Sequence, residues 1–333
     1  MTLVLKDRYG RVHDYLRISL TDKCNLNCIY CNPQLPASKK LDKKEILNFD
    51  ELLRLIGIFT TGLGIRKIRF TGGEPMVRKD IMNFFEALSP IKKQTGFEFA
   101  LTTNGTLLEN NIGALKKAGL DRVNISLDSL RPEVFRRITG SDKLTEVIHS
   151  ISLLEDAGFT NIKINTVVIK KVNDNEVTDF VHFFKDHSVT LRFIEFMPFQ
   201  NNGWTTEAFA GSEEIKKKIE RDFVLNRIED SLQIADLYQV RGYRVKTGFI
   251  SPISQHFCGQ CNRLRLRANG KLKLCLFDPS TNDTDLKEAL RGGCSDNDII
   301  KLVSEALNLK LKEHPGVGTL ALENKNSMQN IGG

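Results

Sequence analysis

"YLRISLTDKCNLNCIYC", residues 15–31, joins a short apolar strand to three closely spaced cysteines. These are Cys24, Cys28 and Cys31. A closed zinc site needs a fourth ligand, commonly a Cys or His at short spacing, and this segment contains none. Three thiolates can instead hold a [4Fe–4S] cluster that leaves one iron open to a small molecule. The stretch therefore indicates an iron–sulfur site, with structural zinc as the alternative.

The chain from residue 15 to 198 repeats one unit, a short apolar strand followed by an amphipathic helix. The expected strands cover residues 15–20, 67–72, 97–103, 122–128, 162–169 and 191–197. Alternating strands and helices favour parallel strands with right-handed crossovers. Six such units predict an α/β fold, an open, partial (β/α)6 TIM-like barrel. A doubly wound sheet is the alternative, because periodicity does not decide closure.

Polar or conformationally special residues stand at the ends of the expected strands. They are "GGEP" (72–75), "TTNG" (102–105), Ser126 with Asp128, and "FMP" (196–198). In parallel α/β folds the working residues sit at the carboxyl ends of the strands. The first cysteine group follows the first strand and meets this rule. We therefore expect the active site at this mouth of the barrel.

The composition is that of an ordinary globular chain with a basic balance. The formal net charge is +7 and the pI is near 9.0, which suggests an anionic partner. Most Lys and Arg residues are spread along expected helices, whereas a nucleic-acid binder usually shows a basic stripe with interleaved aromatics. No apolar run approaches the roughly 18 residues of a membrane span, and the N-terminus has no apolar signal core. We expect a cytoplasmic protein without a membrane or nucleic-acid partner, in which clustered cysteines indicate metal or catalysis.

A second group of three cysteines lies near the other end of the chain: Cys258, Cys261 and Cys275. Residues 263–277 alternate around Ala-Asn-Gly, which predicts a β-hairpin. The alternation places three arginines on one face: Arg263, Arg265 and Arg267. Guanidinium groups beside a metal site suit a polyanion, because Arg offers paired donors to phosphate oxygens. A solvent-facing basic hairpin beside a zinc knuckle is the alternative. Cys294 stands alone, and we interpret it as an inert buried residue.

The strand–helix pattern ends after residue 198. Residues 199–212 indicate a loop, residues 212–223 a helix and residues 238–251 strands. The chain ends with two expected helices and the tail "MQNIGG". We therefore expect two regions, a barrel over residues 1–198 and an α+β extension over residues 199–333 that carries the second cysteine group.

Two motifs are similar to those of radical S-adenosylmethionine (SAM) enzymes. "CNLNCIYC" (24–31) resembles the cluster motif of this superfamily, and "GGEP" resembles its SAM-recognition element, in which glycines let the backbone approach a ligand. Both cysteine groups, with "TGGEP", "LTTNG", "NISLD", "RFIEFMP", "CNRLR" and the terminal Gly-Gly, occur in the order of the GTP 3′,8-cyclase family. This resemblance covers nearly the whole chain. Asn32, where many relatives have Met, departs from it without affecting a ligand.

The resemblance implies two [4Fe–4S] clusters and SAM as cofactors. The first cluster would be held by Cys24, Cys28 and Cys31, and the second by Cys258, Cys261 and Cys275. The SAM pocket would be lined by Tyr30, Gly73, Ser126 and Met197. GTP would meet the second cluster through its guanine and would also contact Arg17, Arg69, Thr102, Lys163, Arg263, Leu264 and Arg265. The tail residues Gly332 and Gly333 would reach toward the active site.

The implied reaction is an early step of molybdenum cofactor biosynthesis. A 5′-deoxyadenosyl radical from SAM would take the ribose 3′ hydrogen of GTP. The sugar radical would then attack guanine C8 to give (8S)-3′,8-cyclo-7,8-dihydro-GTP. This abstraction needs no general base, which agrees with the lack of an obvious His or paired-carboxylate dyad. The implied partners are an external one-electron reductant, a downstream cyclic pyranopterin monophosphate synthase and a second copy in a homodimer.

Two other functions stay open. A radical SAM enzyme that modifies peptides would typically use more cysteines in its tail than the three, plus Cys294, found here. A zinc-stabilised nucleic-acid binder would bind with a strong salt dependence. It leaves the strand-end position of the first cysteine group unexplained.

Overall fold

The computed structural model describes residues 3–31, 40–199, 201–229, 235–278, 283–323 and 327–332. Asn32 and Gly333 therefore lie outside the described residues. The six expected strands are present, each within two residues of its expected bounds: β1 (Tyr15–Ser19), β2 (Lys67–Thr71), β3 (Glu98–Thr103), β4 (Arg122–Ser126), β5 (Ile162–Val168) and β6 (Val189–Glu195). β6 ends at Glu195, whose buried carboxylate accepts backbone N–H groups from Ser212, Ile253 and Ser254 outside the sheet.

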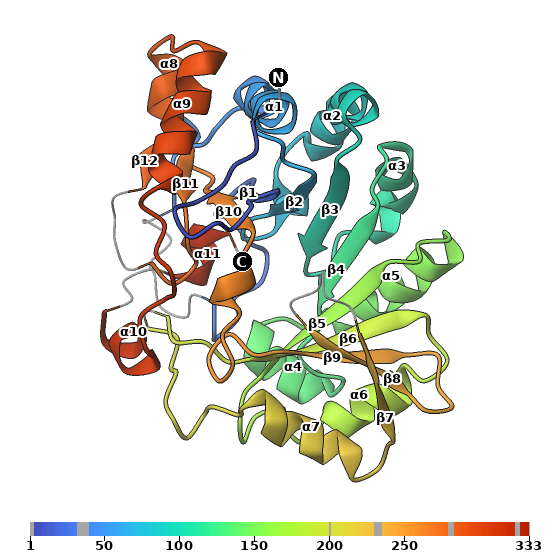
Figure 1. Ribbon diagram of the computed structural model, residues 1–333. Helices are drawn as coiled ribbons and strands as arrows, with labels where there is room; N and C mark the ends of the chain where they lie inside the picture. Colours follow the sequence, from blue (N-terminus) through green and yellow to red (C-terminus); the bar gives the residue numbers. More distant parts are fainter. Residues whose placement is uncertain are drawn as a thin grey trace.

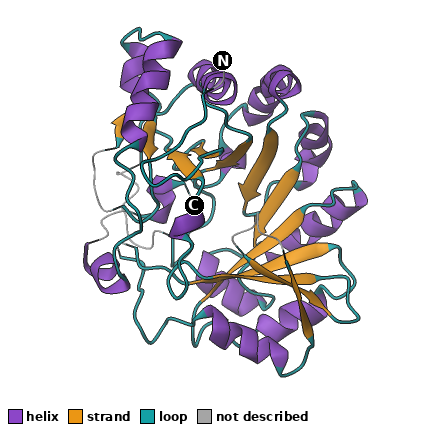
Figure 2. Ribbon diagram, viewed as in Figure 1, coloured by secondary structure: helices purple, strands orange, loops and turns teal. Residues whose placement is uncertain are grey.

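The helices between these strands lie outside the curved sheet, as Figures 1 and 2 show. They are α1 (Phe49–Gly57), α2 (Ile81–Thr95), α3 (Ile112–Lys117), α4 (Pro132–Thr139), α5 (Leu144–Asp156) and α6 (Val177–Phe183). α1 begins at a capping box, in which Asn48 and Glu51 bond each other's backbone N–H groups. The strands β1 to β6 are neighbours in chain order. A doubly wound sheet reverses its strand order, so the partial barrel is confirmed.

The extension lengthens this sheet at both edges. Its strands are β7 (Leu225–Ile228), β8 (Asp236–Val240), β9 (Lys246–Ile250), β10 (Arg263–Leu266), β11 (Lys271–Lys273) and β12 (Thr284–Asp285). The sheet order is β12-β11-β10-β1-β2-β3-β4-β5-β6-β9-β8-β7. β9 is parallel to β6 and β10 is parallel to β1, so the parallel array has eight strands where the βα units alone predict six. The unpaired edges of β1 and β6 are thereby covered.

The expected hairpin is confirmed as the antiparallel pair β10 and β11. The remaining helices are α7 (Ser212–Glu220), α8 (Leu286–Arg291), α9 (Asp296–Leu307), α10 (Val317–Glu323) and α11 (Met328–Ile331). Figure 1 shows α8 and α9 beside α1, whereas α10 and α11 lie near the open side of the barrel. The extension therefore closes around the barrel from both edges.

The core lies between the sheet and its helices. Phe70 and Phe99 of neighbouring strands pack against Phe84 and Phe85 of α2, with ring centroids 5.1–5.6 Å apart. Side chains alternate across a strand, so the apolar residues that face the helices leave polar residues on the inner face. The inner face of the barrel is therefore free to carry a site.

Candidate active site

The first cysteine group lies in the loop after β1, at the carboxyl end of the strand. The Asn27 and Ile29 backbone N–H groups donate to carbonyls of Thr139 and Ile138 at the end of α4, both at 2.9 Å. The Tyr30 hydroxyl donates to Asp128 at 2.7 Å. The loop is thus tied to α4 and to the segment after β4, which fixes where its thiols lie.

The "GGEP" segment packs against the approach to this loop. The Gly73 N–H donates to the Thr21 carbonyl at 2.7 Å, and the Glu74 N–H donates to the Lys23 carbonyl at 2.8 Å. A Cβ on Gly73 would lie 2.4 Å from the Lys23 carbonyl oxygen. No side chain fits there, so this glycine is required by close backbone packing against the cysteine loop.

Glu74 is fully buried beneath the same loop. Its carboxylate accepts the backbone N–H of Asn104 at 2.6 Å, that of Met76 at 3.0 Å and the Thr103 hydroxyl at 2.8 Å. Burial raises the pKa of Glu74 to about 7 although these hydrogen bonds favour the charged form. Glu74 therefore links the segments that follow β2 and β3 beneath the cysteine loop.

The expected SAM residues Tyr30 and Met197 are joined by one side chain. The Asn202 amide donates to the Met197 carbonyl at 2.8 Å and to the Tyr30 carbonyl at 3.3 Å. Ser126 ends β4 at the same mouth, level with Asn165 of β5. Asn202 follows the expected barrel segment and was not predicted from the sequence.

The thiols of the first group lie close enough to influence one another. Burial raises the pKa of Cys28 well above its usual value, and Asp128, Cys31 and Cys24 add to the rise. Burial and Cys24 raise the pKa of Cys31 to about 12. Metal binding to such thiols releases protons. Within the described ranges no three His, Cys, Asp or Glu side chains are placed for a single ion. Three neighbouring thiols are the ligand type that a [4Fe–4S] cluster takes, so this loop could hold one.

The second cysteine group lies at the opposite end of the same strands. Cys258 begins a short 3-10 turn between β9 and β10, and Cys261 directly precedes β10. The Tyr15 N–H at the start of β1 donates to the Asn262 carbonyl. A strand rises about 3.3 Å per residue, so the five residues of β1 separate the two groups by roughly 16 Å. The space between them runs along the inner face of the barrel.

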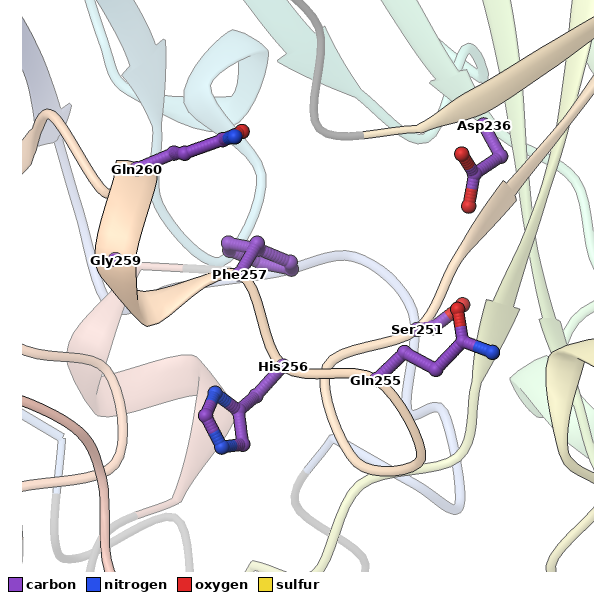
Figure 3. A pocket seen from close by; sticks show the side chains of 7 residues that line it. All are labelled: Asp236, Ser251, Gln255, His256, Phe257, Gly259 and Gln260. Carbon is purple, nitrogen blue, oxygen red and sulfur yellow. The ribbon is translucent and has the colours of Figure 1, made fainter.

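A pocket of about 340 Å³ lies beside the second group. Figure 3 shows Gln260 and Asp236 pointing into it from opposite sides, with Phe257 between them. The Arg263 guanidinium lies 5.3 Å from the centre of the Phe257 ring. The loop that carries Cys258 and Cys261 therefore also packs, through Phe257, against Arg263 at the start of β10.

Six cationic side chains occupy the inner face between the cysteine groups, and we call them the basic layer: Arg17, Arg69, Lys163, Arg192, Arg263 and Arg265. The register explains their meeting, because Arg17 of β1 is level with both Arg69 of β2 and Arg265 of β10. Arg69 also donates to the Thr102 hydroxyl at 3.3 Å, and to the Tyr15 hydroxyl at 2.6 Å. Leu264 faces the other way and is fully buried in the core, so a ligand contact from Leu264 would use its backbone.

The charges of the basic layer repel one another. Burial lowers the pKa of Lys163 to about 7, and Arg192 is the next cause. Burial, then Arg263, lowers the pKa of Arg265 to about 10. Burial alone would raise the pKa of Tyr15, but Arg69 and its neighbours lower it to about 7. Because these buried cations repel one another, an anionic ligand that binds among them would stabilise the basic layer.

The guanidinium groups of Arg263 and Arg265 each hold an N–H group that no described residue accepts. Among the described residues, Arg263 Nε and Arg265 Nη1 are buried and have no hydrogen-bond partner. A buried donor without a partner costs about 1–3 kcal/mol. These donors therefore point to a ligand with oxygen acceptors inside the barrel.

The C-terminal tail enters the same mouth. The Thr71 hydroxyl at the end of β2 donates to the Gly332 carbonyl at 3.0 Å, and Gly332 has a positive φ of 82°. A Cβ on Gly332 would lie 2.5 Å from the Ser19 Cβ. Gly332 thus lies where the resemblance implies, whereas Gly333 falls outside the described residues. Cys294 is half-buried rather than buried: it packs against the edge of the core beside α1, where the Arg54 guanidinium donates to its carbonyl.

Comparisons with known proteins agree with this geometry. Residues 18–184 match the Radical SAM superfamily, and residues 189–315 match Molybdenum Cofactor Synthesis C. A GTP 3′,8-cyclase of Thermodesulfovibrio yellowstonii is 41% identical over 320 residues, which cover 93% of this chain and 96% of that protein. The chain belongs to the GTP 3′,8-cyclase family. Another member, from Peptoclostridium acidaminophilum, is 43% identical, with 93% of each chain covered. The mitochondrial GTP 3′,8-cyclase of Arabidopsis thaliana is 38% identical and covers 99% of this chain.

The solved structure of Streptococcus suis SuiB bound to S-adenosylmethionine has the same fold. Its TM-score is 0.62 at 15% identity, with 97% of this chain and 77% of that chain covered. At this identity the likeness concerns the fold alone. Within the described part of the chain, no helix is long and apolar enough to cross a membrane.

Several residues of the family's site were not predicted from the sequence. Arg192 donates to the Asn165 amide oxygen through Nε and Nη2, at 2.9 and 2.6 Å. Its position in "RFIEFMP" places it on the inner face by strand alternation, which is the signal that could have found it. Glu74 and Asp128 lie within recognised motifs, yet only the structure shows what they bond. Lys310, discussed below, carries no motif.

Proposed function

We propose that this protein is a GTP 3′,8-cyclase that acts early in molybdenum cofactor biosynthesis. The observation that carries the proposal is the basic layer, with two buried guanidinium groups in need of acceptors, between two groups of three thiols. A nucleoside triphosphate has the length and the charge to span from one thiol group into this layer. The names of the relatives supply the identity of the nucleotide.

The binding residues divide into four sets, which would hold the two clusters, SAM and GTP. Cys24, Cys28 and Cys31 would hold a [4Fe–4S] cluster, and Cys258, Cys261 and Cys275 a second one. Tyr30, Gly73, Ser126 and Met197 would line the SAM pocket. GTP would contact Arg17, Arg69, Thr102, Lys163, Arg263, the Leu264 backbone and Arg265. Arg192 would also contact GTP, because it belongs to the basic layer.

These residues bind and orient rather than transfer protons. The cluster held by Cys24, Cys28 and Cys31 would supply, when bound, the electron chemistry for reductive cleavage of SAM and so for removal of the ribose 3′ hydrogen. Arg263 and Arg265 would fix the triphosphate by charge-assisted hydrogen bonds. Gly73 would keep the backbone packed against the cysteine loop beside SAM, and the Gly332 segment, bonded to Thr71, would lie at the mouth. Positioning of this kind is a large part of what a radical reaction asks of the protein.

The proposal extends to partners. An external one-electron reductant, a downstream cyclic pyranopterin monophosphate synthase and a homodimer follow from the family resemblance, as does a cytoplasmic location.

The test is made on protein reconstituted without oxygen. About eight irons per chain, from two four-iron clusters, and a cyclised nucleotide formed from GTP, SAM and dithionite are expected. Eight irons without turnover of GTP would keep the radical chemistry and favour the peptide-modifying alternative. Zinc in place of iron would contradict the proposal.

A further inference from the structure

A buried lysine that pairs with no carboxylate of the described residues lies beneath the second cysteine group. Lys310 follows α9 and is only 2% exposed. Its ammonium donates to the Arg263 carbonyl at 2.9 Å and to the Leu274 carbonyl. These two carbonyls belong to residues that stand close to Cys261 and directly before Cys275 in the chain. The ammonium therefore joins the start of β10, after Cys261, to the segment after β11 that leads into Cys275.

The charge of Lys310 needs an anion. Among the described residues no Asp or Glu forms a salt bridge with it. The charged groups that act on it are Arg11 and Arg265, which repel it, and the thiols of Cys261 and Cys275, which attract it as thiolates. A buried ammonium that carbonyls alone satisfy is costly unless a negative charge lies nearby. The thiolates are the anions that the site offers.

The segment around Lys310 is held against this group. The Arg11 guanidinium donates to the Cys258 carbonyl at 2.7 Å and to the Leu311 and Lys312 carbonyls at 2.7 and 2.8 Å. The His314 backbone N–H donates to the Cys258 thiol. Lys310 is therefore fixed in place relative to the thiols.

We propose that Lys310 is the buried counter-charge of the second cluster and sets the ease of its reduction. The inference rests on the proposal that Cys258, Cys261 and Cys275 hold that cluster. A cluster with three thiolate ligands carries net negative charge, and net charge, hydrogen bonds and burial set its reduction potential. A fixed positive charge beside it favours the reduced form, and Lys310 serves the cluster as a positioning residue.

The experiment measures the reduction midpoint of the second cluster by titration followed by electron paramagnetic resonance. The background chain carries Cys24→Ala, Cys28→Ala and Cys31→Ala, so that the signal comes from the second cluster. Lys310→Gln keeps a donor for the carbonyls and removes the charge, whereas Lys310→Arg keeps the charge. We expect Lys310→Gln to disfavour reduction at least tenfold, which is about 59 mV for one electron, and Lys310→Arg to stay near the background value.

Lys273 provides the matched control. It is fully buried on β11 but forms a salt bridge to Asp283 at 3.5 Å, so Lys273→Gln should leave the midpoint unchanged. A Lys310→Gln chain with about four irons and the background midpoint would overturn the inference. Lys310→Gln could also fail to bind iron. In that case, iron retained in Lys310→Arg would support the counter-charge role, whereas iron lost from both variants would overturn it and leave Lys310 a purely structural role. A background chain without iron would instead overturn the second cluster itself.

Discussion

Replacing Arg265 by Ala tests the assignment of the basic layer. Arg265 is 5% exposed, and its Nη1 is buried without an acceptor among the described residues. It is level with Arg17 across the β1–β10 pair, and Arg263 lowers its pKa. In the ligand-free protein this guanidinium is repelled by its neighbours, so it can contribute to binding far more than to folding.

The expected magnitude follows from these contacts. A hydrogen bond to a charged group contributes about 1.5–3 kcal/mol, and each 1.4 kcal/mol changes the dissociation constant about tenfold. Arg265→Ala should therefore weaken GTP binding about 10- to 150-fold. In wild type, bound GTP also relieves the repulsion between Arg265 and its cationic neighbours. The variant lacks this gain, which weakens its GTP binding further.

The assay is calorimetric titration of the reconstituted protein with GTP, beside SAM cleavage driven by dithionite alone. Arg267→Ala is the control, because Arg267 lies on the same strand face but pairs with Asp283 at 2.9 Å. We expect Arg267→Ala to keep the affinity, and Arg265→Ala to keep SAM cleavage. An unchanged affinity in Arg265→Ala, or an equal loss of SAM cleavage, would refute the reasoning.

Three further predictions concern the other parts of the site. The pKa of Lys163 is about 7 without ligand, and a triphosphate favours its ammonium form. GTP affinity should therefore fall as the pH rises through 7, and it should fall less in Lys163→Arg. The same dependence of affinity on pH in both proteins would contradict this. Gly73→Ala would place a Cβ 2.4 Å from the Lys23 carbonyl oxygen, a strain of about 1–3 kcal/mol, and should lower the iron content toward that of one cluster; full iron content would argue against the packing role. Cys28→Ala should abolish SAM cleavage whereas Cys294→Ala should not, and persistent cleavage in Cys28→Ala would remove the first cysteine group from the reaction.

The strands and the mouth of the barrel could be predicted because they depend on local pattern. Apolar alternation marked all six strands, and their carboxyl ends carried the motifs. β9 and β10 were expected as strands, but their parallel pairing with β6 and β1 was not. Pairing across more than 200 residues, as between Tyr15 and Arg263, leaves no periodic signal in either segment.

The site residues divide in the same way, into those that local pattern predicts and those that depend on tertiary packing. Arg17, Arg69 and Arg265 were predicted, and the register explains why they meet at one level of the barrel. Lys310 was not predicted, because its role depends on two carbonyls and two thiols that tertiary packing brings beneath it. Its sequence context, near the end of a lysine-rich segment, indicates only a solvated surface.

The central claim is that the barrel holds GTP with its ribose toward the SAM pocket. The most direct measurement uses GTP carrying deuterium at the ribose 3′ carbon, with SAM, reductant and the reconstituted protein. We expect deuterium in the 5′-deoxyadenosine that forms, and its loss from the nucleotide product. Deuterium-free 5′-deoxyadenosine, with the label retained on the nucleotide, would contradict it.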